Sequence, residues 1–248
     1  MPTLPARNDR SLEYAACVER EEELERLQSQ AKARKSLLVF GPTGVGKSRL
    51  LQTFVAQQPL ALYVPHSRSP RELLHGLLDA LRSVDIRIKL PANVETLSSS
   101  SLKGVVHRTL DANSFQMVLD HLEGPSRVLT GLIKDLHYFG RTPVIFASRS
   151  PHMEDIGALQ PLCALKSERI EMKNWPHYIA LQFAQREAEK AQLSASNLGS
   201  VLPSLVEWSD GNPGAIIQLL KMARMPQYQA GDQIKAHVLY LDFRMGRY

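Results

Sequence analysis

The segment GPTGVGKS, residues 41–48, places glycines, a lysine and a serine at a spacing that suits phosphate binding. It matches the pattern G-x-x-x-x-G-K-[ST] in full, after an apolar run and before a helical pattern. Glycines let backbone N–H groups converge on phosphate oxygens, and the N-terminus of the following helix adds partial positive charge. We expect Lys47 to reach the β- and γ-phosphates and the Ser48 hydroxyl to ligate Mg²⁺. The residues predicted to bind ATP or ADP here are Gly41, Pro42, Thr43, Gly44, Val45, Gly46, Lys47, Ser48 and Arg49.

A second candidate for this chemistry is Asp120, which ends the apolar run FQMVLD (115–120). A carboxylate at the C-terminal edge of a neighbouring strand can support Mg²⁺, so we predict Asp120 and Ser48 as its protein ligands. Hydrolysis also needs a group that orients the attacking water. His121 could do so as neutral imidazole, although a solvated surface histidine fits the same position. Glu123, in a loop-like Glu-Gly-Pro stretch, is the other candidate and would reach the phosphate only if the chain turned at once into a helix.

Strand-like and helical patterns alternate through most of the chain, which favours an α/β fold with a parallel sheet covered on both faces. Ser69 and Pro70 suit the N-cap and first position of a helix. The last stretch, IKAHVLYLDFRMGRY, contains a further strand-like run. The strands are predicted at 36–40, 60–65, 115–120, 142–148 and 168–173, and the helices at 18–33, 48–58, 69–84, 101–112, 126–139, 177–193, 197–209 and 213–224.

The expected fold is therefore a P-loop NTPase with a three-layer αβα core, a parallel five-stranded sheet and a small helical lid. We predict an ATPase core at 1–174, the lid at 175–225 and a C-terminal extension of unknown role at 226–248. The 248 residues are 44% hydrophobic and 22% charged, as in ordinary globular proteins. With no long apolar run or secretory signal, we expect a cytoplasmic chain without membrane contact, in which Cys17 and Cys163 are reduced. The net charge of +5 is compatible with a nucleic-acid partner and equally with a mixed, solvated surface.

With these residues in place, roughly 17–224 resembles the AAA+/STAND branch of P-loop ATPases, which includes close relatives of the origin-recognition type. VEREEELERL (18–27) resembles the entry motif of that branch, which implies that Val18 and Arg20 lie beside the adenine. Glu19 departs from the glycine usual there. The stretch 60–81 resembles the family's second strand and following helix, which supports the fold alone.

Two further motifs resemble parts of the family that respond to the nucleotide. PVIFASRS (143–150) is similar to the sensor strand, which implies that Arg149, with Ser148, reads the γ-phosphate. A guanidinium can donate a forked hydrogen bond to a terminal phosphate. SDGNPGAI (209–216) resembles the Gly-x-Pro lid motif, which implies that Gly211, Asn212 and Pro213 couple the lid to the bound nucleotide.

The chain also departs from the family pattern. His121 stands where the family has its catalytic glutamate, so we predict slow intrinsic turnover, with Lys47, Asp120, Glu123, His121 and Arg149 as the catalytic set. The lid lacks the usual arginine, since the residues there are AIIQ, and 248 residues leave no room for winged-helix or repeat domains. An arginine that acts in trans is also expected, and its candidates are Arg141, Arg224, Arg244 and Arg247.

Three functions fit this sequence. The first is an ATP-dependent switch that forms homo-oligomers and acts on DNA in transposition, repair or mobile-element defence. The second is a nucleotide-gated adaptor that binds no nucleic acid and recruits an effector protein encoded nearby, with HVLYLDFRMGRY as a docking strand. The third is a small-molecule kinase, against which the lid motif argues.

Overall fold

The computed structural model describes residues 19–84, 91 and 94–246; Cys17, Val18 and Arg247, named above, lie outside this part of the chain. The chain divides into two compact units, each with its own core. The first contains the residues up to Gly41 together with Lys47–Met172. The second contains Pro42–Gly46 and the residues from Lys173 onward. The middle of the phosphate-binding segment thus groups with the C-terminal residues, because it contacts them directly.

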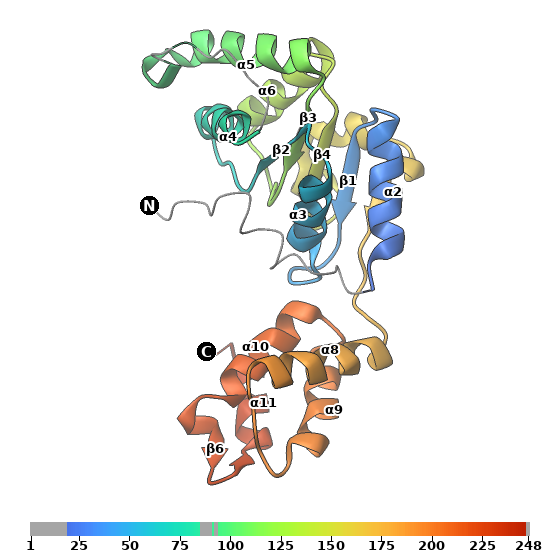
Figure 1. Ribbon diagram of the computed structural model, residues 1–248, viewed down its shortest axis with the longest axis vertical. Helices are drawn as coiled ribbons and strands as arrows, with labels where there is room; N and C mark the ends of the chain where they lie inside the picture. Colours follow the sequence, from blue (N-terminus) through green and yellow to red (C-terminus); the bar gives the residue numbers. More distant parts are fainter. Residues whose placement is uncertain (1–18, 85–90, 92–93, 247–248) are drawn as a thin grey trace. The chain divides into compact units, whose positions relative to one another are not determined.

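The first unit is built on a five-stranded sheet in the order β2-β3-β4-β1-β5, and every neighbouring pair is parallel. This confirms the predicted parallel five-stranded sheet. Because β4 lies between β3 and β1, the residues that follow these three strands meet at one edge of the sheet (Figure 1). The strands are β1 (Leu37–Phe40), β2 (Ala61–Val64), β3 (Gln116–Leu119), β4 (Val144–Ser148) and β5 (Arg169–Glu171).

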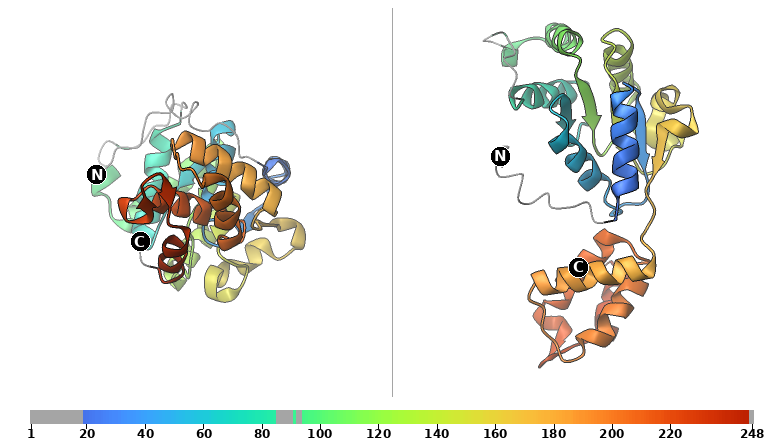
Figure 2. Two further views of the ribbon diagram at one scale, coloured as in Figure 1. Left: turned by 90° about the horizontal axis from the view of Figure 1, so that it is seen from below. Right: turned by 45° about the vertical axis from the view of Figure 1, so that its right-hand side comes forward.

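Helices lie on both faces of this sheet (Figures 1 and 2). One face packs against α4, α5 and α6 through alternate strand residues such as Met117, Leu119, Val144 and Phe146, since side chains two apart share a face. Helices α2 and α3 cover the other face. The helices of this unit are α2 (Glu21–Lys32), α3 (Lys47–Gln57), α4 (Pro70–Arg82), α5 (Ser99–Asn113), α6 (Arg127–Tyr138) and α7 (Met153–Ile156), with 3₁₀ turns η2 (Val94–Thr96), η3 (Gly157–Cys163) and η4 (Lys166–Glu168).

Helix starts follow the capping residues in the sequence. Ser69 accepts a hydrogen bond from Glu72 N, and Pro70 is the first residue of α4, as predicted. The buried leucines of α4 each contribute roughly 1.5–3 kcal/mol of hydrophobic stabilisation. Helix α5 begins at Ser99, two residues before the predicted start, because Ser98 accepts from Ser101 N and caps it.

The second unit is a helical bundle with a short hairpin. Its elements are α8 (His177–Lys190), α9 (Leu198–Trp208), α10 (Pro213–Ala223), η5 (Pro226–Tyr228), β6 (Gln229–Ala230), β7 (Gln233–Ile234) and α11 (Ala236–Arg244). Asn197 holds the hairpin in place, since its side-chain amide donates to Ile234 O and accepts from Ile234 N, both at 2.9 Å. Tyr228, Ile234 and Leu239 share one hydrophobic core with α8, α9 and α10.

The predicted strand near the C-terminus is wrong, because these residues form helix α11. Their aromatic and β-branched content suggested a strand. However, Ala236, Leu239 and Phe243 recur at helical spacing and pack on the core of the second unit.

The described helices include none that is both long enough and apolar enough to span a membrane.

Candidate nucleotide-binding site

Gly41 and Lys47, which flank residues 42–46 of the phosphate-binding segment, belong to the first unit. Gly41 N donates to Arg149 O at 3.2 Å, which ties the end of β1 to the end of β4. A Cβ atom at position 41 would lie 2.2 Å from Met172 O, so only glycine fits there. The Lys47 ammonium donates to Gly41 O at 2.7 Å.

Lys47 lies within a group of charges at this edge of the sheet. Partial burial lowers the pKa of its ammonium group, while the carboxylates of Glu123 and Asp120 act in the opposite direction and Arg149 adds to the lowering. The four residues come from α3, from the segment after β3 and from the end of β4. The fold therefore brings together four of the five predicted catalytic residues. Glu123, Asp120 and Arg149 lie within electrostatic range of the ammonium group of the fourth, Lys47.

Asp120 is buried, with 2% of its surface exposed, and both of its carboxylate oxygens are bonded. Oδ1 accepts from His121 N at 2.8 Å, and Oδ2 accepts from the Tyr63 hydroxyl at 2.7 Å. Gln52 Nε2 in turn donates to the Tyr63 hydroxyl at 3.2 Å. These bonds fix the carboxylate in one orientation.

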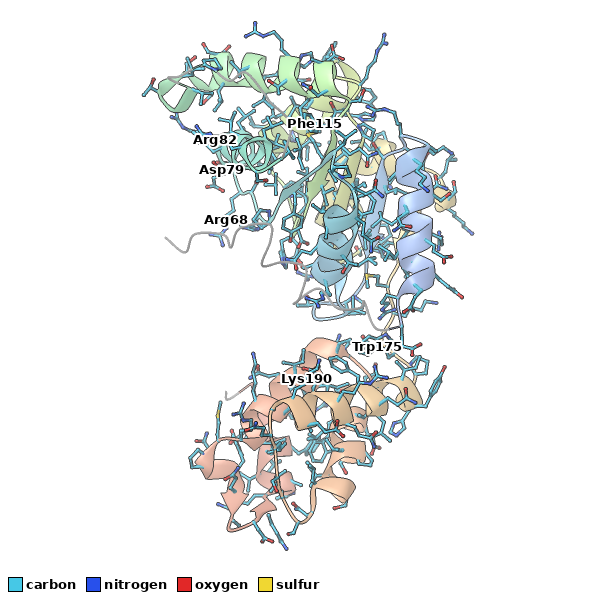
Figure 3. The ribbon with its side chains drawn as sticks, viewed as in Figure 1. Arg68, Asp79, Arg82, Phe115, Trp175 and Lys190 are labelled. Carbon is cyan, nitrogen blue, oxygen red and sulfur yellow. The ribbon has the colours of Figure 1, made fainter. Side chains whose placement is uncertain are left out.

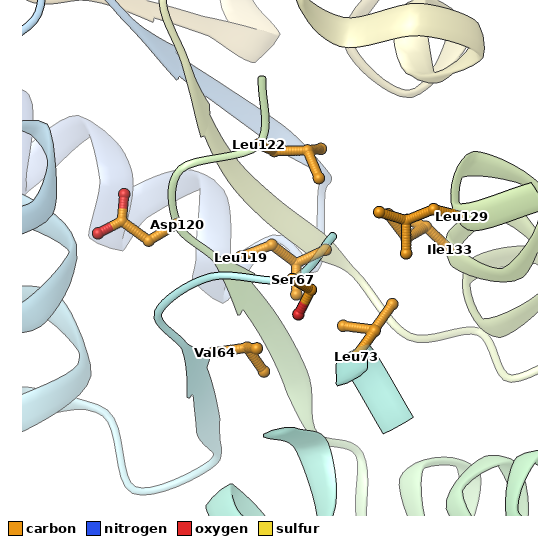
Figure 4. Close-up of a pocket in the computed structure, with 8 residues that line it drawn as sticks. All are labelled: Val64, Ser67, Leu73, Leu119, Asp120, Leu122, Leu129 and Ile133. Carbon is orange, nitrogen blue, oxygen red and sulfur yellow. The ribbon is translucent and has the colours of Figure 1, made fainter. Parts of the chain in front are cut away.

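Behind Asp120 lies a small cavity with largely apolar walls, and the carboxylate points away from it (Figure 4). The cavity walls come from the ends of β2 and β3 and from α4 and α6. The only buried hydroxyl there, Ser67 Oγ, has no hydrogen-bond partner within the described part of the chain. The hydrogen bonds of the Asp120 carboxylate are therefore made on the side away from the cavity, to His121 N and the Tyr63 hydroxyl.

His121, next along the chain, turns toward α3. Its φ of 50° is left-handed, which is uncommon for a residue with a side chain. The turn brings its Nε2 to 3.2 Å from Ser48 Oγ and 3.8 Å from Asp120 Oδ2. The imidazole thus lies against both predicted Mg²⁺ ligands.

Glu123 lies in a loop, as its sequence indicates, yet it still reaches the charged group. Leu122 N donates to Ala147 O of β4 and Gly124 N to Asp155 O of α7, both at 2.9 Å, so the loop is held by these two elements. Glu123 Oε2 lies 3.3 Å from Arg149 Nη2, and both side chains are exposed. Glu123 therefore lies beside Arg149 without a helix after β3, and its position over a phosphate stays a prediction.

Other predicted site residues have different surroundings. The buried Ser148 hydroxyl donates to Asp155 O at 3.4 Å, toward α7. Arg20 precedes α2 and pairs with Glu23 at 2.9 Å. Arg49 is half-buried in the first turn of α3.

In the second unit, the segment Pro42–Gly46 contacts the start of α10. Gly214 N donates to Gly44 O at 2.9 Å, and Asn212 Nδ2 donates to Thr43 O at 3.0 Å. Gly44 has a φ of 83°, and a Cβ atom there would lie 2.6 Å from Asn212 Oδ1. Both glycines are needed for this close backbone approach.

Asn212 uses most of its hydrogen-bonding capacity within the protein. Besides Thr43, Nδ2 donates to Asn174 Oδ1 at 3.0 Å, and Oδ1 accepts from Ala215 N at 3.1 Å as the cap of α10. Gly211 O accepts from Trp175 N, and Pro213 is buried as the first residue of α10. The predicted lid motif and the start of α10 are therefore hydrogen-bonded to the backbone of the phosphate-binding segment.

The donor set suits Mg²⁺ bound together with a nucleotide. The Ser48 hydroxyl and the Asp120 carboxylate are hard oxygen ligands, which Mg²⁺ prefers. Among the described residues, no three His, Cys, Asp or Glu side chains gather into a metal site of their own. Phosphate oxygens would have to complete the coordination.

A family model described as AAA domain matches residues 29–140 of this chain. The same arrangement of elements occurs in solved AAA+ structures. The fold is that of the AAA+ P-loop ATPases. No curated protein sequence matches the chain.

Three solved structures illustrate the AAA+ likeness. A Walker-type ATPase of Pyrococcus abyssi shares 19% identity and a TM-score of 0.64, over 92% of this chain and 73% of its own. The ORC1 protein of Aeropyrum pernix, solved in complex with DNA, shares 14% sequence identity with a TM-score of 0.66. The match covers 93% of this chain and 66% of the ORC1 chain. Domain III of the replication initiation protein DnaA of Thermotoga maritima shares 17% sequence identity with a TM-score of 0.58. The match covers 98% of this chain and 99% of the DnaA domain. This chain thus spans just under two thirds of ORC1.

Sequence reasoning missed Tyr63, Gln52 and Asn174. Tyr63 carried a usable signal, because a phenol in an otherwise buried strand needs a polar partner. Its strand, β2, pairs with β3, so the nearest partner at that edge is Asp120. No local signal identifies Asn174, whose contact with Asn212 depends on the fold of the second unit.

Tyr63→Phe is expected to raise the Mg²⁺ concentration that half-saturates ATP hydrolysis by at least about tenfold, because a lost hydrogen bond to a charged group costs about 1.5–3 kcal/mol. Binding of ATP in EDTA should be unchanged. Tyr138→Phe, which alters an exposed tyrosine, is the matched control. An unchanged Mg²⁺ dependence would show that Tyr63 does not orient Asp120.

Proposed function

We propose that this chain binds Mg-ATP through the segment 41–48 and Asp120 and works as a slowly hydrolysing switch. The observation that carries the proposal is the group formed by Lys47, Asp120, Glu123 and Arg149 at one sheet edge. Mg²⁺ would neutralise phosphate charge when bound. Lys47 would bind the phosphates, and Arg149 would contact the terminal one.

Slow turnover is supported by the contacts of the two candidates for orienting the water, Glu123 and His121, because each already contacts another side chain of the site. Glu123 is paired with Arg149 and must exchange that partner before it can hold a water. His121 contacts Ser48 and lies beside Asp120. Glu123 is the stronger candidate, because it pairs with Arg149 and acts on the Lys47 ammonium, and a carboxylate accepts a water proton well.

The switch would act through the lid motif, as in the STAND branch. Nucleotide phosphates order the segment 42–46, and Asn212 and Gly214 are bonded to its backbone. A change in that segment therefore alters the start of α10 directly.

Glu123→Gln is expected to lower the rate of single-turnover ATP hydrolysis at least tenfold, because the amide no longer accepts a proton. His121→Ala should change the rate less than about threefold. Both variants should bind ATP as the wild-type chain does, in an equilibrium titration. The reverse ranking of the two rates would assign the water to His121, and fast wild-type turnover would contradict the switch.

We further propose that the switch forms homo-oligomers and acts on DNA. The DNA role is supported by the ORC1 structure, which was solved in complex with DNA, and by exposed basic residues around the N-termini of α4 and α6. These are His66, Arg68, Arg71 and Arg127, and Arg68 is visible at the rim of the first unit (Figure 3). Arg68 Nε donates to His66 Nε2 at 3.0 Å. An arginine acting in trans within the oligomer would be Arg141, Arg224 or Arg244, all of which are exposed.

The double variant Arg68→Glu/Arg71→Glu is expected to weaken binding of short duplex DNA at least tenfold in a gel-shift titration with ATP. Wild-type binding should fall steeply between about 50 and 200 mM salt, because counterions are released on phosphate contact. Arg186→Glu, an exposed change on α8, should bind as the wild type does. If no DNA is bound at low salt, the DNA role is refuted. Light scattering with and without ATP tests the oligomer separately.

A further inference from the structure

Helix α11 has apolar residues on two opposite faces. Leu239 is fully buried, and Ala236 and Phe243 pack beside it on the core of the second unit. Val238, Leu241 and Met245 lie on the other face, with 41%, 43% and 52% of their surfaces exposed. Their i, i+3, i+7 spacing aligns them in one stripe along the helix. The core of its own unit therefore accounts for only one apolar face of α11.

The helix that displays this stripe is held firmly. The Tyr228 hydroxyl donates to Asp242 Oδ2 at 3.0 Å. The Tyr240 ring lies on Trp208 of α9, with 4.9 Å between ring centroids. The stripe is thus presented on a fixed scaffold, which lowers the entropic cost of binding a partner.

One flank of the stripe is basic. His237 and Arg244 are exposed and seven residues apart, so they lie on the same side of the stripe. Within α11, all of whose residues are described, the single carboxylate is Asp242, which lies across the stripe and is bonded to Tyr228. A partner that covers the stripe would meet the Arg244 guanidinium and the His237 imidazole along this flank.

We propose that this face of α11 docks an amphipathic helix of another protein, with apolar residues every three or four positions and Asp or Glu beside them. Charge complementarity selects this occupant. A second copy in the symmetric antiparallel arrangement would bring the two Arg244 flanks together and leave both guanidinium groups without a carboxylate partner. The proposal does not depend on nucleotide binding.

The test uses the full chain and two fluorescein-labelled helical peptides of about 20 residues. Both carry leucines at i, i+3 and i+7; one has glutamates along the flanks and the other has lysines. In fluorescence anisotropy, the glutamate peptide should bind at least about tenfold more tightly than the lysine peptide, a difference of about 1.4 kcal/mol. Leu241→Glu should weaken binding of the glutamate peptide at least tenfold without altering ATP affinity. Arg244→Glu should reverse the preference between the peptides.

Leu165→Glu provides the control, since Leu165 is 59% exposed but lies in the first unit. This variant should bind the glutamate peptide as the wild type does. Equal affinity for both peptides, no binding of either, or full binding by a folded Leu241→Glu variant would refute the proposal. A dimer in light scattering that Leu241→Glu dissociates would assign the face to a second copy instead.

Discussion

Lys47→Ala is expected to weaken ATP binding at least about 100-fold, because hydrogen bonds to charged groups contribute about 1.5–3 kcal/mol each and Lys47 is expected to make two with the phosphates. The half-buried ammonium is bonded to Gly41 O and lies within electrostatic range of two carboxylates, so it is already positioned before a nucleotide arrives. Isothermal titration with ATP measures the effect.

The matched control for this change is Lys32→Ala, which removes an exposed lysine from the last turn of α2 in the same unit. It should bind ATP as the wild type does. A folded Lys47→Ala variant that keeps its affinity within about threefold would contradict the proposed phosphate site.

Gly214→Ala is expected to destabilise the second unit by roughly 1–3 kcal/mol, the usual cost of forcing extra atoms into a filled space. The new Cβ atom would lie 2.7 Å from Gly44 Cα and 3.1 Å from Gly44 O, so the helix and the phosphate-binding segment must separate. Separation would break the bond from Gly214 N to Gly44 O, and ATP affinity should fall at least about fivefold. Both tryptophans, Trp175 and Trp208, belong to this unit, so their fluorescence reports its unfolding.

Gly199→Ala tests the same substitution without the contact. Gly199 lies in α9, and a Cβ atom there meets nothing within 4 Å. Alanine should therefore stabilise this helix by up to about 1 kcal/mol. If both variants shifted the thermal midpoint in the same direction, the contact between Gly44 and Gly214 would have no energetic role.

Together, the two predictions separate the two parts of the proposed site. Lys47, in the first unit, is proposed to bind the phosphates, and Gly214, in the second, is proposed to act through the backbone of the phosphate-binding segment. A chain that lost binding in Lys47→Ala but kept it in Gly214→Ala would be a nucleotide-binding protein whose lid does not respond to the loop.

Features with a local physical cause could be predicted from the sequence. The glycine turn before α3, the apolar strands and the Ser69 cap depend on neighbouring residues, and each was found where its pattern indicated. The alternation of strands and helices determined the parallel sheet, because parallel neighbours need crossover helices. The place of Asp120 after β3 followed from the same pattern.

Only the tertiary structure decided how distant residues meet. The strand order places β2 beside β3 and β4 between β3 and β1, which pairs Tyr63 with Asp120 and Glu123 with Arg149. The close approach of Gly44 and Gly214, and the helical form of α11, depend on packing in the second unit. Such contacts join residues far apart in the chain, where local periodicity carries no information about which surfaces will face each other.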